Sequence, residues 1–340
     1  MNHKVLYILL FGLVANLFDV NAQDLHFSQY FNAPILVNPA NTGFNPDNDY
    51  RIGGNYRNQW SAVGSPYKTM SLWGDVQLFT NKFENGWMGV GGALYRDAAG
   101  SGNLINTSAY ASVAYHQMLG YSSLLSIGFT GGFISKKIDI AKLSFDNQWN
   151  GKFFDATLPS NEPFAFSQTS YADLQAGINY AYFSSEKFYL NAGLSAQHIN
   201  RPKESFFDPL VSDASIDMRY TAFLNASIKV GESWIVNPNA YISKMNTASE
   251  LVVGVNANRD LSGDGSQQMI LGLYFRNADA VVPVFGFQLN DTRFTFNYDA
   301  TISTLKSANN TRGAYEVSIV KTGVVSSALA RGVRCPSVKF

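Results

Sequence analysis

The sequence predicts an all-β protein, a transmembrane antiparallel β-barrel of about 14 strands with an N-terminal periplasmic arm. Three observations lead to this fold class. Apolar and polar side chains alternate with period 2 along many segments, and long and short connections alternate between those segments. In addition, few residues are charged although many are aromatic.

The composition favours a membrane barrel over a soluble domain or a helical membrane protein. Only 15% of the residues are charged, against roughly 25% in soluble domains, whereas 14% are aromatic. The mean hydropathy of -0.08 is too low for a bundle of membrane helices. The 25 basic and 25 acidic side chains balance, so no bulk charge favours nucleic acid as a partner.

The first 22 residues have the layout of a secretory signal peptide. Lys4 precedes an almost wholly apolar run from Val5 to Phe18, and Val20 and Ala22 occupy the −3 and −1 positions of a cleavage site. The run has about 14 residues, which is fewer than the roughly 20 that a membrane-spanning helix needs. We therefore expect the exported chain to begin at Gln23.

Period-2 alternation is clearest in Tyr171–Ser184, Arg219–Val230 and Thr292–Ser303. One face of each segment carries mostly Ala, Leu, Ile, Phe and Tyr, and the other carries more polar side chains. A soluble barrel would turn the apolar face inward, whereas a membrane barrel turns it outward to lipid. The mixture of small and aromatic residues, with aromatics near the strand ends, favours the membrane barrel.

The connections between the predicted strands alternate in length. Strands are expected to start near residues 50, 67, 86, 103, 122, 170, 187, 218, 233, 247, 266, 279, 292 and 313. Long connections such as Ile138–Thr169 and Asn200–Asp217 follow odd-numbered strands, and short ones such as Ser184–Glu186 follow even-numbered strands. Because outer-membrane barrels have long external loops and short periplasmic turns, we expect an outer-membrane location with both termini in the periplasm.

The chain is expected to have four parts: a signal peptide (1–22), an N-terminal arm (23–49), a barrel (50–321) and a periplasmic C-terminal tail (322–340) that holds Cys335. Fourteen strands enclose more space than the eight-stranded barrel that side chains alone can fill. The arm and the connection Ile138–Thr169 are the segments long enough to plug the lumen.

The sequence indicates a non-enzymatic protein without a cofactor. None of the four histidines lies in a metal-ligand spacing such as HExxH, and no GxSxG motif is present. His198 lies close to Ser195 along the chain, but the strand period places the two on opposite faces.

Asp260, Ser262 and Asp264 form a weak candidate calcium site. They occupy positions 1, 3 and 5 of a calcium-loop pattern, with Gly265 at position 6. Leu271 stands where the bidentate carboxylate of position 12 is expected. A polar hairpin turn, which favours Gly and Asp, explains the same residues more simply.

The arm sequence from Asp24 to Gly43 closely resembles the opening of the PorP/SprF family of the Bacteroidetes type IX secretion system. Tyr56–Trp60, Gly313–Glu316 and Cys335 followed by proline resemble further parts of that family. The resemblance implies an outer-membrane barrel of the secretion and gliding machinery. It also implies two partners, the C-terminal domain of a secreted adhesin or other cargo, and the periplasmic core or a peptidoglycan-associated lipoprotein.

Six residues are candidates for contact with a partner. Near the expected external rim these are Arg57, Trp60 and Arg312, which could meet a protein or outer-membrane lipid; in the arm they are Phe31, Asn38 and Pro39. The alternative function is a diffusion porin or a channel for hydrophobic substrates. In that case Asp173, Arg293 and Asp299 would line an open lumen.

Overall fold

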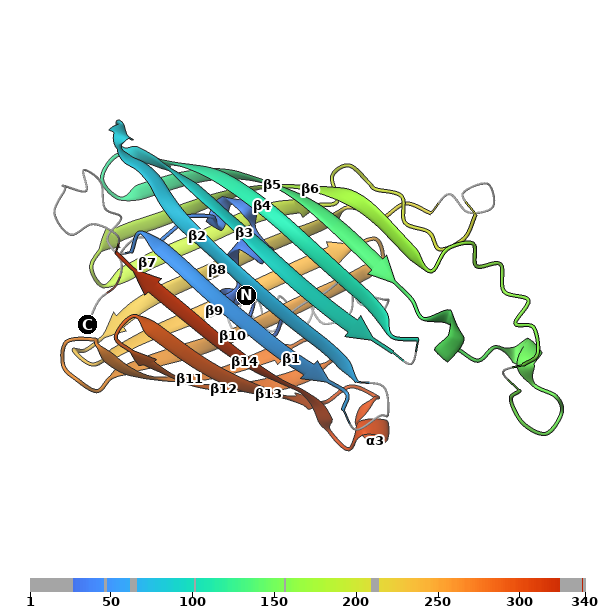
Figure 1. Cartoon of the computed structure of the whole chain (residues 1–340). Coiled ribbons are helices and arrows are strands. Elements are labelled where there is room, and N and C mark those ends of the chain that lie inside the picture. The colour runs from blue at the N-terminus through green and yellow to red at the C-terminus, as the bar shows by residue number, and fades with distance from the viewer. Residues whose placement is uncertain are drawn as a thin grey trace, which may run out of the picture.

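The computed structural model describes residues 27–45, 48–61, 66–100, 102–155, 157–208, 214–324 and 338. Fourteen antiparallel strands form a closed barrel in which neighbours in sequence pair and β14 pairs with β1 (Figure 1). The strands are β1 (Tyr50–Gln59), β2 (Tyr67–Phe83), β3 (Gly86–Ala99), β4 (Leu104–Met118), β5 (Ser123–Lys137), β6 (Gln168–Ser185), β7 (Phe188–Gln197), β8 (Arg219–Val230), β9 (Trp234–Met245), β10 (Ala248–Asp260), β11 (Gln267–Arg276), β12 (Ala280–Leu289), β13 (Thr292–Thr301) and β14 (Arg312–Gly323).

The predicted fourteen-stranded antiparallel barrel is confirmed. Every strand begins within two residues of its expected position, and β14 ends at Gly323, just past the expected barrel end at residue 321. The predicted signal peptide and Cys335 lie outside the described residues. The arm, which we expected in the periplasm, lies inside the barrel from Phe27 to Phe44, as described below.

The strands turn their apolar faces outward, which is the reverse of a soluble barrel. Phe129, Leu174 and Leu194 are 59%, 51% and 60% exposed, whereas Asp173 and Asn297 on inward faces are 0% exposed. Such a distribution is stable only where lipid covers the outside, because exposed leucine and phenylalanine in this number would be costly in water. The protein is therefore a membrane β-barrel. The described part of the chain holds no helix that is both long and apolar enough to cross a membrane.

The two ends of the barrel differ in their connections. We call the end where the odd-numbered strands finish the long-loop end, because it carries the connections 138–167, 198–218 and 302–311. The opposite end, the short-turn end, carries connections such as 84–85, 186–187 and 290–291. The predicted alternation holds only in part, because the connections 100–103, 246–247 and 277–279 at the long-loop end are also short, and the connection 261–266 at the short-turn end is longer than these.

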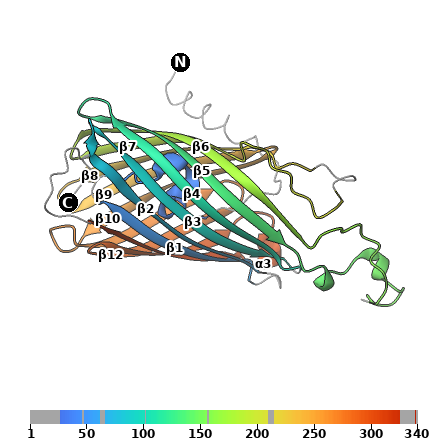
Figure 2. The same cartoon turned by 45° about the horizontal axis from the view of Figure 1, so that its top comes forward.

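The longest connection, 138–167, does not plug the lumen. It extends away from the barrel beyond the long-loop end in both views (Figures 1 and 2). It contains two single turns of 3-10 helix, η3 (Ile140–Lys142) and η4 (Asp146–Gln148). Phe164 stacks on Phe207 of the second long connection, with ring centroids 5.1 Å apart, so the two loops support each other.

A charge introduced on the outer face tests the inside-out arrangement. Phe129 lies near the middle of β5, so Phe129→Arg places a cation close to the bilayer centre. We expect the variant to lose about 2–4 kcal/mol of unfolding free energy, measured by urea titration in lipid vesicles. Tyr121→Arg in the fully exposed β4–β5 turn is the control and should change little. Equal effects of the two substitutions would contradict a lipid-facing Phe129.

Candidate functional site

The arm Phe27–Phe44 fills the middle of the lumen. It folds into three short turns, η1 (Tyr30–Asn32), α2 (Pro34–Val37) and η2 (Pro39–Asn41), which lie inside the barrel and are drawn in blue (Figure 1). Pro34 and Pro39 stand at the first turns of α2 and η2, where proline starts a helix but cannot continue one. The Asn38 side chain accepts a hydrogen bond from Ala40 N at 2.8 Å and so caps η2.

Inward-facing glycines of the wall receive the arm backbone. A Cβ atom at Gly128 of β5 would overlap the carbonyl of Pro39, and one at Gly177 of β6 would overlap the Asn38 side chain. The Asn38 Nδ2 atom donates to the carbonyl oxygens of Ile178 and Leu194, at 3.0 and 3.1 Å. The arm therefore contacts the wall at distances that only glycine permits, as an integral part of the barrel interior.

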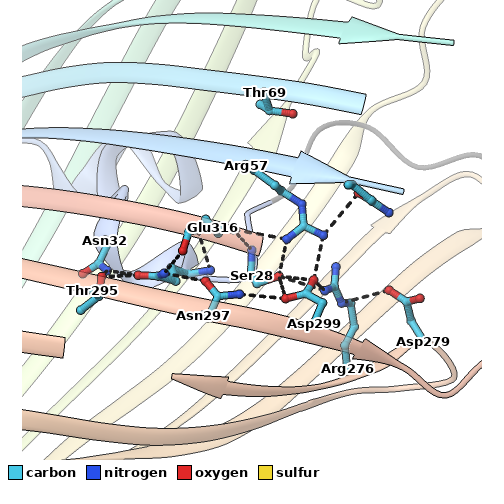
Figure 3. Close-up of polar contacts among 12 residues, drawn as sticks. Ser28, Asn32, Arg57, Thr69, Arg276, Asp279, Thr295, Asn297, Asp299 and Glu316 are labelled. Atoms are coloured by element: carbon cyan, nitrogen blue, oxygen red, sulfur yellow. Dashed lines mark hydrogen bonds and ion pairs between the residues drawn. The ribbon is translucent and has the colours of Figure 1, made fainter. Parts of the chain in front are cut away.

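At the long-loop side, acidic residues of the wall bind the start of the arm (Figure 3). The Glu316 carboxylate accepts the backbone N–H groups of Ser28 and Gln29 at 3.0 and 3.1 Å. The Ser28 hydroxyl donates to Asp299 at 2.8 Å. These contacts come from β13 and β14, so residues 271 and 288 positions apart in the chain meet in this cluster.

Two arginines neutralise these two carboxylates. Arg57 of β1 pairs with Asp299 at 2.8 Å and with Glu316 at 3.3 Å, and Arg276 of β11 pairs with Asp299 (Figure 3). All four side chains are at most 4% exposed. Buried ion pairs are tolerated when every charge has a partner, and breaking one leaves an uncompensated buried charge. The arm thus depends on this four-residue cluster, which we call the charge cluster.

Amide side chains continue the contact toward the barrel middle. Gln29 Nε2 donates to Asn297 Oδ1 at 2.5 Å, and Asn32 Nδ2 donates to Thr295 Oγ1 at 2.8 Å. Asn32 also donates to Gln29 Oε1 at 2.6 Å. Polar side chains on the inward face of β13 therefore form hydrogen bonds with polar side chains of the arm. Buried polar atoms require such partners.

At the short-turn side, the end of the arm is held by β2, β3 and β4. Gly43 N donates to Asp75 Oδ2 at 2.8 Å, and Trp87 Nε1 donates to Gly43 O at 3.0 Å. His116 Nε2 donates to Thr42 O at 2.8 Å, and His116 Nδ1 is hydrogen-bonded to Ser126 Oγ at 2.7 Å. The Trp87 and His116 rings stack at 4.9 Å.

These contacts give the arm a direction. Ser28 meets Arg57 and Asp299, which lie near the ends of β1 and β13 at the long-loop end. Gly43 meets Trp87, the second residue of β3, at the short-turn end. The arm therefore runs through the lumen from the long-loop end to the short-turn end, where β1 begins.

Cavities lie on both sides of the arm. A cavity of about 500 Å³ at the long-loop end is lined by Tyr95, Lys136, Tyr171 and Glu204 among others, and Lys136 pairs with Glu204 at 2.7 Å. A cavity of about 540 Å³ at the short-turn end is lined by carboxamide side chains, by Arg293 and by arm residues. Polar side chains contribute to the lining of both cavities, and the arm occupies the space between them.

The candidate partner residues fall into two groups. Arg57, Asn38 and Pro39 are buried in the lumen, and Phe31 stacks on Tyr274 with centroids 5.4 Å apart. Three of these residues belong to the arm, and Arg57 belongs to the wall that binds it. All four therefore contact other parts of the same chain.

Two candidates remain at the rim of the long-loop end. Arg312 is exposed at the start of β14. Trp60 follows β1 and packs edge-on against Tyr67, with ring centroids 5.0 Å apart.

The three residues proposed as channel lining have local roles. Asp173 accepts from His198 Nδ1 at 2.8 Å and from Gln175 Nε2 at 2.9 Å. Asp299 belongs to the charge cluster, and Arg293 donates to Gln288 Oε1 at 3.0 Å. The sequence identified them as inward-facing, but it could not show partners such as His198, Arg57 and Gln288, which lie on other parts of the barrel.

The expectation that Ser195 and His198 lie on opposite faces is wrong. Strand β7 ends at Gln197, and His198 has a φ of 56°, which turns its side chain back into the lumen. Both residues are buried there. Ser195 Oγ nevertheless donates to Val37 O at 2.8 Å, so the hydroxyl that a catalytic pair would use is hydrogen-bonded to the arm.

Asp260, Ser262 and Asp264 form a hydrogen-bonded turn between β10 and β11. Ser262 N donates to Asp260 at 3.0 Å, and Ser262 Oγ donates to Asp264 at 2.6 Å. Bonds from Ser262 and Ser266 lower the pKa of Asp264 to about 2. Among the described residues, no group of three or more His, Cys, Asp or Glu side chains could hold a metal ion. The hairpin-turn alternative accounts for these residues.

Gly128→Ala tests whether the arm requires glycine where its backbone contacts the wall. The added methyl group would overlap the Pro39 carbonyl, so either the arm or β5 must shift. We expect a loss of about 1–3 kcal/mol of unfolding free energy and a rise in single-channel conductance. Gly131→Ala in the same strand is the matched control, because its methyl group would contact only Leu174, at 4.0 Å. If both variants behave alike, the arm does not depend on glycine at position 128.

Glu316→Ala tests the charge cluster. The substitution leaves Arg57 with one anion fewer and two arm N–H groups without acceptors. We expect a loss of about 3–5 kcal/mol of unfolding free energy, measured by urea titration. Glu232→Ala in the exposed β8–β9 turn is the control. A cost for Glu316→Ala no greater than that of the control would show that the cluster does not hold the arm.

Comparison with known proteins places the chain in a family. Solved structures that are similar include the CymD monoaromatic hydrocarbon channel, at 9% identity and a TM-score of 0.49 over 86% of this chain and 92% of that chain. They also include the Pseudomonas putida toluene transporter TodX, at 9% identity and a TM-score of 0.47 over 89% of this chain and 98% of that chain. The Ralstonia pickettii toluene transporter TbuX has 10% identity and a TM-score of 0.47 over 86% of this chain and 94% of that chain. No curated protein matches the sequence. A family model matches residues 19–320, nearly the whole chain, and the chain therefore belongs to the type IX secretion system membrane protein PorP/SprF family.

Proposed function

We propose that this outer-membrane barrel anchors a secreted partner of the type IX system, or assists its export, without conducting solutes and without catalysing a reaction. The observation that carries the proposal is the arm that fills the lumen and is bound by the charge cluster. A barrel whose interior is occupied by its own chain has only its rims and outer surface left for partners. The family membership supports a role in type IX secretion.

The long-loop end is the proposed contact site for cargo, an adhesin-like protein with its C-terminal domain. The connection 138–167 carries Trp149, Phe153 and Phe154, which are 50%, 59% and 54% exposed. Exposed aromatic side chains on a loop that extends away from the barrel favour protein contact, because aromatics contribute much of the affinity at interfaces. Arg312 at the same end adds a cation at the rim.

The short-turn end is the proposed contact site for the periplasmic core of the machinery or for a peptidoglycan-associated lipoprotein. In this orientation the long loops are external, and the C-terminal tail after Gly323 starts in the periplasm. The outward apolar face is in contact with outer-membrane lipid. A part in gliding motility would follow if the cargo is a surface adhesin.

The alternative is a diffusion porin or a channel for hydrophobic substrates. The cavities of about 500 and 540 Å³ at the two ends favour it. For an open channel, the arm must leave the lumen. The contacts of the charge cluster oppose that movement, and so do the close contacts of the arm with Gly128 and Gly177.

Deleting the gene and comparing the cell-surface proteins by mass spectrometry separates the two functions. We expect one or a few secreted proteins to disappear from the surface and the uptake of small solutes to remain normal. An unchanged surface with reduced uptake would favour the porin, and loss of every secreted protein would indicate a general component of the machinery.

In planar bilayers, the intact protein should conduct little, and deletion of residues 27–44 should open a pore because the lumen loses its filling. Deletion of residues 140–166 is the control and should leave the conductance low, since this loop lies outside the barrel. An intact protein that conducts like the arm deletion would contradict a closed barrel.

A further inference from the structure

Every carboxylate of the described strands faces the lumen. Six of them are at most 9% exposed: Asp75, Asp173, Glu250, Asp260, Asp299 and Glu316. The seventh, Asp97 of β3, has the same strand phase as the buried Tyr95 and accepts a hydrogen bond from the buried Thr69. The outer face of the described strands therefore carries no negative charge.

Four exposed cations lie on this outer face near the long-loop end: Lys68 of β2, Arg96 of β3, Lys137 of β5 and Lys244 of β9. Lys68 has the same strand phase as the exposed Met70, and Arg96 has the same phase as the exposed Leu94. Among the described residues, no carboxylate forms an ion pair with any of these four cations. Their charges are therefore available to an anion outside the barrel.

Lys68 and Arg96 are close neighbours on two adjacent strands. The register pairs Lys68 with Ala98 and Arg96 with Met70, so the two cations lie diagonally across the β2–β3 pair. Diagonal neighbours on one face of a sheet are roughly 7–8 Å apart, so two long side chains can reach one anion between them. Without an anion, two like charges this close repel each other.

A hydroxyl group completes the arrangement. Thr107 of β4 lies directly opposite Arg96 on the same outward face, and its side chain is exposed. The hydroxyl can donate one hydrogen bond, in addition to the donors of the ammonium and guanidinium groups. We call Lys68, Arg96 and Thr107 together the outer cation site.

The apolar residues of β2 show how deep in the membrane the outer cation site lies. The outward residues from Met70 to Leu78 are apolar or glycine: Met70, Leu72, Gly74, Val76 and Leu78. This stretch is about 27 Å long, or roughly 20 Å along the barrel axis at the usual strand tilt, which is close to the usual apolar band of about 25 Å. Lys68 is the next outward residue, so the site lies where the apolar band ends and lipid head groups begin.

We propose that the outer cation site binds the phosphate group of an anionic lipid. Arg96 and Lys68 bind the phosphate oxygens, the first with a planar fork of donors and the second as a compact charge, and Thr107 donates a further hydrogen bond. The acyl chains of the lipid lie along the apolar outer face next to Met70 and Leu94. This inference does not depend on the proposed function.

The short-turn end provides a matched control. Among the described side chains, the outward cations of the strands at that end are Arg259 and Lys321. They belong to β10 and β14, which are not neighbours in the barrel, so they cannot bind one phosphate together.

Native mass spectrometry of the full-length protein in detergent, with added lipid, tests the proposal. The unaltered protein should bind one phosphatidylglycerol roughly 30-fold more tightly than phosphatidylcholine, since each cation near an anionic lipid surface contributes about a factor of five. The Lys68→Gln, Arg96→Gln double variant should lose this preference. The Arg259→Gln, Lys321→Gln double variant removes the same charge and should keep it.

Heat-modifiable migration on gels checks that each variant is a folded barrel. Equal binding of the two lipids by the unaltered protein would overturn the proposal, and this comparison needs no variant. Equal losses in the two double variants would also overturn it, because the preference would then follow net charge. Glycerol 3-phosphate, which has the phosphate but no acyl chains, should bind more weakly than phosphatidylglycerol, and equal binding would contradict a lipid site.

Discussion

The width of the barrel is the constraint on which the rest of the structure depends. Fourteen strands enclose more space than inward side chains can fill, so the interior must hold water or another part of the chain. The arm from Phe27 to Phe44 fills the middle of that space and turns a ring of strands into a packed structure. The inward faces of most strands are consequently arranged around the arm.

Two kinds of contact adapt the wall to the arm. Glycines at Gly128 and Gly177 let the arm backbone approach where any side chain would overlap it. Carboxylates at Asp299 and Glu316 supply acceptors for arm groups that would otherwise lie buried without partners. Arg57 and Arg276 neutralise these carboxylates, so the interior can hold charge without an open, water-filled channel.

The sequence alone predicted the strands well. Their positions follow from the period-2 pattern and from the lengths of the connections, which are local properties of the chain. Segments such as Tyr171–Ser184 and Thr292–Ser303 each carry the full alternation within themselves. The closed fourteen-stranded barrel could therefore be predicted without knowing which side chains meet across the lumen.

The position of the arm could not be predicted, because its side chains suit two environments equally. Ser28, Gln29, Asn32 and Asn38 are polar, as a segment in water would be, and the lumen that receives them is polar as well. The sequence showed that two segments are long enough to plug the lumen, the arm and the connection Ile138–Thr169. It did not show which of them does so. The choice depends on strand register, which brings Asp299 and Glu316 to the same point as Ser28. The side-chain direction of His198 could not be predicted from the strand period, because a positive φ at this one residue turns its side chain to the other face.

Hydrogen exchange of the arm amides tests most directly that the arm is an integral part of the barrel interior. In the intact protein in lipid, the amides of Ser28, Gln29 and Ala40 should exchange as slowly as those in the middle of the strands, because each is buried and hydrogen-bonded. Amides of the connection 138–167 provide the fast reference. Exchange of the arm amides at the rate of that connection would contradict the account.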